Sequence, residues 1–117
     1  MIPEHLPRGG FDAEFYAGFE PIGSEPVVEK RRYSAFFATD LALLLHEHGI
    51  ETIVVAGVKT NVCIRATATD GFAHGFTVVI PREATNSNRP HLEEASIEDM
   101  TRYIARVVPI DEAVALL

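Results

Sequence analysis

The single cysteine of this 117-residue chain, Cys63, stands where a cysteine could act as a nucleophile. It follows the apolar run ETIVVAG at residues 51–57, which is typical of a strand buried on both faces. The next stretch, NVCIRATATDGFAHG, predicts a helix that ends at Gly75. Cys63 is therefore predicted in the first helical turn, where free backbone N–H groups and the positive end of the helix dipole favour a thiolate.

Position alone leaves a second interpretation of Cys63 open. A free cysteine is among the most buried residue types and often behaves as a small apolar side chain. Either a reactive thiol or a packed core residue fits the pattern of a strand, a turn and a helix.

The elements around Cys63 alternate between strands and helices. Thr39 is expected to cap a helix that carries Leu41, Leu44 and Leu45 on one face and stops at Gly49. Residues 1–26 are read as mostly loop with one short helical turn. The other expected elements are a short strand at 27–29, a strand at 76–81, a helix at about 91–106, a strand at 107–110 and a final turn. This alternation predicts a parallel sheet with sites at the carboxyl ends of its strands.

Composition and charge limit the class of protein. At 117 residues, with 47% apolar and 23% charged residues, the chain fits one globular domain. A net charge of −7 argues against nucleic acid or an anionic membrane as a partner. No apolar run approaches the roughly 18 residues of a membrane span. One cysteine excludes an intrachain disulfide and suits a reducing cytoplasm.

Three segments together resemble a known family. EPVVEKRRYSAFFATDL, VVAGVKTNVCIRATATDGFAHGFTVVI and EAT resemble the isochorismatase-like cysteine hydrolases, within them the ureidoacrylate and N-carbamoylsarcosine amidohydrolase branch. The resemblance covers residues 26–110. It implies a three-layer α/β/α fold with a Rossmann-like parallel sheet. It also implies cysteine-dependent hydrolysis of a C–N bond in a small amide or ureido compound, with no organic cofactor.

The resemblance also implies roles for individual residues. Cys63 matches the family's nucleophile, and Lys30 matches the lysine that lies beside it. A cis peptide bond is implied between Val58 and Lys59, and the N–H groups of Lys59 and Cys63 are implied as the oxyanion hole. Thr60 and Asn61 are expected to shape the turn and to contact the substrate.

One part of the family's pattern has no match here. The family's third catalytic residue is an aspartate at the end of the first strand, followed by D-x-Q, and nothing before Lys30 fits. We therefore expect a single, N-terminally truncated domain over residues 1–117. Two strands would be missing from mid-sheet, between residues 27–29 and the strand that begins at Thr52. Because uncovered sheet edges tend to pair, a homo-oligomer is expected.

Other functions remain open from the sequence. The alternative to a hydrolase is an inactive or partner-dependent domain that lacks the catalytic aspartate, and a redox-sensing thiol is a third possibility. No metal site is expected, because His46 and His48 face different ways on a helix and no paired-cysteine spacing occurs. Asp70 could face the same side of its helix as Cys63, although a structural polar contact is the simpler interpretation.

Overall fold

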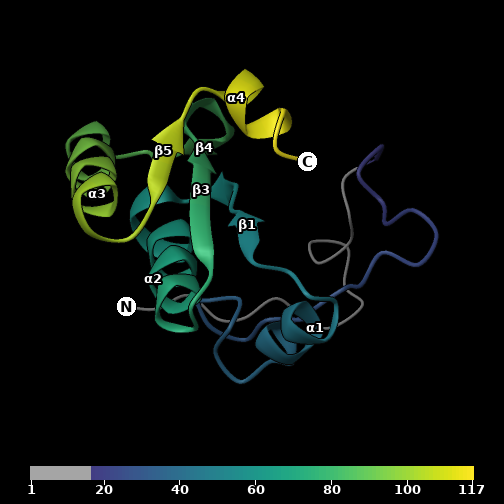
Figure 1. Ribbon diagram of the computed structural model, residues 1–117. Helices are drawn as coiled ribbons and strands as arrows, with labels where there is room; N and C mark the ends of the chain where they lie inside the picture. The colour runs from purple at the N-terminus through teal and green to yellow at the C-terminus, as the bar shows by residue number, and fades with distance from the viewer. Residues whose placement is uncertain (1–16) are drawn as a thin grey trace.

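The computed structural model of this protein describes residues 17–117, and its centre is a three-stranded parallel sheet (Figure 1). The strand order is β1-β3-β5, in which β1 is Thr52–Val54, β3 is Thr77–Pro81 and β5 is Arg106–Val108. Val54 lies opposite Val79 in the first pair, and Ile80 lies opposite Val107 in the second. The strands are joined by helices α2 (Arg65–Ala73) and α3 (Pro90–Tyr103). The predicted α/β class and parallel sheet are confirmed.

The strands alternate their side chains between two apolar layers. Val78 and Ile80 of β3 belong to a core cluster that also contains Ala68 of α2 and Met100 of α3. Val79, with the opposite orientation, joins Val108 and Ala113 in a second cluster. The second cluster lies under α4, which is Ile110–Val114. Helices thus cover both faces of the sheet, as a parallel sheet requires.

A second, smaller pair of strands holds the loops together at the carboxyl ends of β1 and β3. Strand β2 (Gly57–Val58) pairs in parallel with β4 (Thr85–Asn86). A short 3-10 turn, Arg82–Ala84, leads from β3 into β4. This pairing brings the segment before Cys63 beside the segment that leads into α3.

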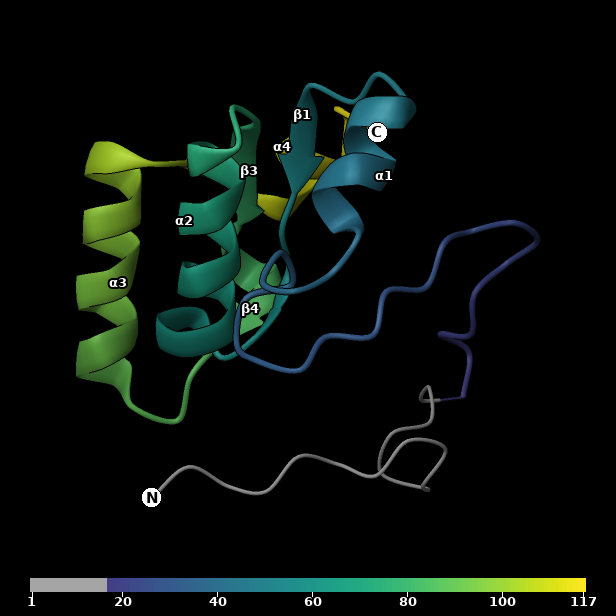
Figure 2. The same ribbon diagram turned by 90° about the horizontal axis from the view of Figure 1, so that it is seen from below.

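Helix α1 (Leu41–Glu47) lies on the β1 side of the sheet, away from α3 (Figures 1 and 2). Its N-cap residue is Asp40 rather than Thr39, whose hydroxyl accepts the N–H of Leu41 at 3.3 Å. The predicted stop is present at Gly49, which has a φ of +67°. Within residues 17–117, no helix is both long enough and apolar enough to cross a membrane.

The strand predicted at residues 27–29 is wrong. This segment runs without regular secondary structure, and the side chain of Val27 is 54% exposed. A strand needs a neighbour for its backbone groups, and in the described part of the chain β1 pairs only with β3.

The other differences from the predicted elements are smaller. Helix α3 ends at Tyr103, before the predicted 106, because β5 already begins at Arg106, and the helical turn expected within residues 1–26 falls largely outside the described residues.

Candidate active site

Cys63 lies in a widened helical turn, not in a regular first turn of α2. Thr60–Ile64 form a π-helical turn that continues directly into α2. The carbonyl of Lys59 accepts the N–H groups of Val62 and Ile64, both at 3.1 Å, so neither bond uses the N–H of Cys63. The Cys63 side chain is half-buried and belongs to neither apolar core cluster. This geometry favours an accessible thiol over a core residue.

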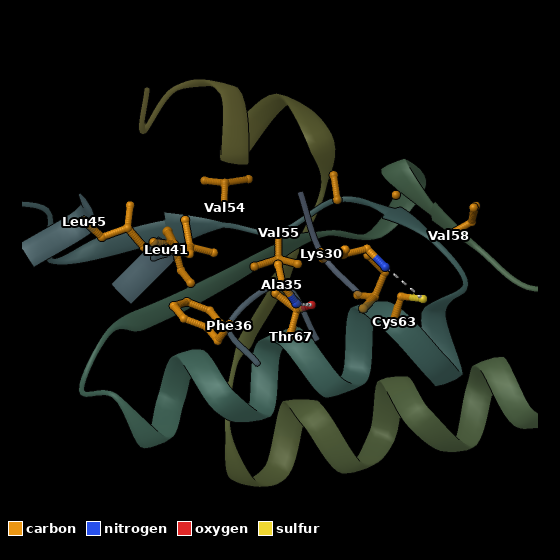
Figure 3. Close-up of a pocket in the computed structure, with 14 residues that line it drawn as sticks. Lys30, Ala35, Phe36, Leu41, Leu45, Val54, Val55, Val58, Cys63 and Thr67 are labelled. Carbon is orange, nitrogen blue, oxygen red and sulfur yellow. Dashed lines mark hydrogen bonds between the residues drawn. The ribbon is translucent and has the colours of Figure 1, made fainter. Parts of the chain in front are cut away.

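Lys30 reaches Cys63 from a distant part of the sequence. Its Nζ atom lies 3.8 Å from Cys63 Sγ (Figure 3). The same atom donates a hydrogen bond to the carbonyl of Arg32 at 3.2 Å. The lysine belongs to the exposed, irregular segment that precedes α1. An ammonium group beside a thiol favours the thiolate and can stabilise negative charge on a bound substrate.

The chain enters this turn through a cis peptide bond between Val58 and Lys59, at the position implied by the family resemblance. Gly57, which precedes Val58, has a φ of +127°, a conformation that residues with L side chains rarely adopt. A Cβ atom there would lie 3.6 Å from Ile64 Cδ1, so space is not the constraint. The backbone conformation is what requires glycine.

The two residues expected to contact the substrate have different surroundings. The Thr60 side chain is fully buried, and its hydroxyl donates to Glu93 Oε1 at 3.3 Å. This burial favours a role in shaping the turn over contact with a substrate. The half-buried Asn61 accepts the hydroxyl of Ser87 through Oδ1 at 2.8 Å. The first contact ties the turn to α3, and the second ties it to the segment between β4 and α3.

A pocket of about 380 Å³ opens from the Lys30–Cys63 pair along β1. Its walls come from α1, β1, the start of α2 and the segment before α1, and most of its lining is apolar (Figure 3). Among the described residues that line it, none is acidic. Asp70, considered from the sequence, does not line it either.

A charged cluster beside the turn was not predicted from the sequence. The Arg82 guanidinium lies 3.3 Å from Glu93 Oε2 and 2.8 Å from Glu94 Oε1. Burial lowers the pKa of Arg82, but the hydrogen bonds and charges of Glu94 and Glu93 outweigh it and raise the pKa overall. The only local signal for this cluster was the presence of acidic residues early in α3. Their partner, Arg82, precedes the helix and could not be assigned from the sequence.

His46, His48 and His74 make structural contacts. The His46 ring stacks on Phe76 at a centroid distance of 4.7 Å, and His48 Nδ1 lies 2.8 Å from the carbonyl of Leu44. His74 caps α2 and lies 5.2 Å from the Phe36 ring. Within residues 17–117, no group of three or more His, Cys, Asp or Glu side chains is arranged to hold a metal ion.

The chain matches a known family. The isochorismatase domain model matches residues 2–112. The chain belongs to the isochorismatase family. It is 39% identical to maleamate amidohydrolase from Pseudomonas putida, over 99% of this chain and 54% of the relative. N-carbamoylsarcosine amidase from Arthrobacter sp. is 33% identical over 97% of this chain and 43% of its own length.

A solved structure in the isochorismatase family supports the fold directly. The isochorismatase-like hydrolase from Alkaliphilus metalliredigens superimposes with a TM-score of 0.90 at 36% identity. The match covers 98% of this chain and 64% of that protein. The chain thus spans about half the length of the curated relatives it matches.

Proposed function

We propose that this isochorismatase-family chain carries the nucleophile of a hydrolase that cleaves a C–N bond in a small amide or ureido compound. The observation that carries the proposal is the 3.8 Å contact between Lys30 Nζ and Cys63 Sγ, two residues that line the pocket. The substrate class rests on relatives named for maleamate and N-carbamoylsarcosine.

In the proposed reaction, the thiolate of Cys63 attacks the substrate carbonyl carbon and forms a C–S bond. The N–H groups of Lys59 and Cys63 stabilise the oxyanion, and the Lys30 ammonium adds positive charge nearby. The C–N bond then breaks, and the nitrogen leaves as ammonia or an amine after taking up a proton. Water hydrolyses the thioester, which releases the acid and the free thiol. None of these steps requires an organic cofactor.

A carboxylate that could carry the proton in this reaction is not among the described residues that line the pocket. This observation favours a second candidate, a partner-dependent domain that is inactive until another segment supplies the carboxylate. In such a unit, loss of one member typically costs on the order of 10⁴-fold in rate. We therefore expect at most trace hydrolysis by this chain alone.

The deciding experiment measures ammonia release from maleamate, N-carbamoylsarcosine and ureidoacrylate. The chain is assayed alone and after addition, fused or in trans, of an apolar strand that ends in D-x-Q. We expect activity only in the supplemented protein, and we expect Cys63→Ala to abolish it. Robust turnover by the 117 residues alone would contradict the partner-dependent candidate, and Glu29 and Asp70 would then be the first acids to mutate.

Two further features belong to the same proposal. Strand β1 presents one unpaired edge in the described part of the chain, and unpaired edges favour association, so we propose a homo-oligomer. A free thiol at the site suits a reducing cytoplasm, which we propose as the location. A redox-sensing role for the thiol is the third candidate, and hydrolysis abolished by Cys63→Ala would argue against it as the main function.

A further inference from the structure

Glu93, in the first turn of α3, lies between the turn that carries Cys63 and the cationic side chain of Arg82. One carboxylate oxygen, Oε1, accepts the hydroxyl of Thr60 at 3.3 Å. The other, Oε2, accepts from Arg82 Nη2 at 3.3 Å. The Glu93 side chain is only 13% exposed, so this carboxylate is largely shielded from water.

The neighbouring glutamate provides a natural comparison. Glu94 pairs with the same Arg82 at 2.8 Å, but its side chain is 71% exposed. Among the described residues, Glu94 makes no hydrogen bond or ion pair with the Thr60–Ile64 turn. The two glutamates therefore share a cationic partner and differ in whether they reach the turn that holds the thiol.

Thr60 is the point through which Glu93 can act on Cys63. It begins the π-helical turn and lies directly after Lys59, whose carbonyl holds Val62 and Ile64. The Thr60 side chain is fully buried, and a buried hydroxyl without a partner costs free energy. If Glu93 could not accept its hydrogen bond, the turn would shift until the hydroxyl found another partner.

We propose that Glu93 is a positioning residue, which fixes the Thr60–Ile64 turn so that Cys63 Sγ stays beside Lys30 Nζ. A role of Glu93 in catalysis rests on the function proposed above. Its effect on the position of Cys63 does not depend on that function. Ser87 supports the same turn from the side through Asn61 Oδ1. Glu93 is not among the described residues that line the pocket beside Lys30 and Cys63.

The test measures the second-order rate of Cys63 alkylation by iodoacetamide at fixed pH in the folded chain, which requires no hydrolysis. We expect Glu93→Leu and Thr60→Val each to lower this rate about two- to fivefold. A shifted turn would lose the contact between Lys30 and Cys63, and an exposed ion pair contributes an effect of this size. The double variant should fall no further than either single variant. Glu93→Gln keeps a carbonyl acceptor for Thr60 and should stay close to the wild-type rate.

Glu94→Leu is the matched control, because it removes a carboxylate from Arg82 without touching the turn. It should leave the alkylation rate unchanged. Three results would each overturn the proposal. The first is that the effects of Glu93→Leu and Thr60→Val on the rate add up in the double variant. The others are an unchanged rate in folded Glu93→Leu and an equal loss of rate in Glu94→Leu. If Glu93→Leu does not fold, Thr60→Val and Glu93→Gln decide the question, and an unchanged rate in Thr60→Val overturns it. Absence of hydrolase activity would count against the proposed function only.

Discussion

Replacement of Lys30 by methionine is the most direct test of the site, because it removes one charge beside the thiol and keeps a side chain of similar length. The ammonium lies 3.8 Å from Cys63 Sγ. At that separation, two unit charges attract each other by about 1 kcal/mol in the dielectric of water. Loss of the charge therefore destabilises the thiolate relative to the thiol.

The size of the effect is limited by solvent. Lys30 is exposed, and exposed ion pairs are typically worth about 0.2–1 kcal/mol because water and salt screen them. One kcal/mol corresponds to about fivefold in an equilibrium, so we expect Lys30→Met to lower Cys63 alkylation about two- to fivefold near pH 7. The difference from wild type should shrink as salt is added.

The assay follows loss of free thiol with iodoacetamide, with free cysteine as the reference. Wild-type protein should react faster than free cysteine, because the Lys30 ammonium lies beside an accessible thiol. Arg31→Met is the matched control, since it removes the same charge from the adjacent, exposed residue. A wild-type rate no higher than that of free cysteine, or an equal loss in Lys30→Met and Arg31→Met, would refute the assignment of Lys30 as the partner of Cys63.

Three further predictions concern stability and assembly. Met100→Ala should lower the free energy of unfolding by about 2–5 kcal/mol in urea titrations, because Met100 is fully buried, whereas Leu92→Ala, at a side chain 41% exposed on the same helix, should cost far less. Thr85→Val should raise stability by about 1 kcal/mol, because the buried Thr85 hydroxyl lacks a hydrogen-bond partner in the described structure; a loss instead would show that the hydroxyl is satisfied. Light scattering should find a dimer or larger oligomer, and a monodisperse, cooperatively folding monomer would argue against pairing through the β1 edge.

Local sequence patterns predicted most of the regular elements. The apolar runs that became β1 and β3 and the leucines of α1 depend on short-range periodicity, which one segment carries by itself. Gly49 and Gly75 end α1 and α2 as expected, with φ values of +67° and +92°. Such stops are local, because only glycine adopts these angles readily.

The same patterns failed where pairing decides the outcome. Residues 27–29 have the composition of a strand, yet a strand exists only if another strand offers its backbone groups. The π-helical form of the Thr60–Ile64 turn was also not predictable. The hydrogen bond from Thr60 to Glu93 of α3 depends on how the helices pack, because the two residues are far apart in the sequence.

By itself, the sequence determined that Cys63 follows a strand and a glycine turn and opens a helix, because these signals lie within about 25 consecutive residues. It also pointed to Lys30, through a resemblance and not through any local rule. Only the tertiary structure decided that Lys30 Nζ comes within 3.8 Å of Sγ and that Glu93 holds the turn from α3. Each pair is separated by 33 residues, and contacts at such a distance depend on how the sheet and its helices pack, which no single segment encodes.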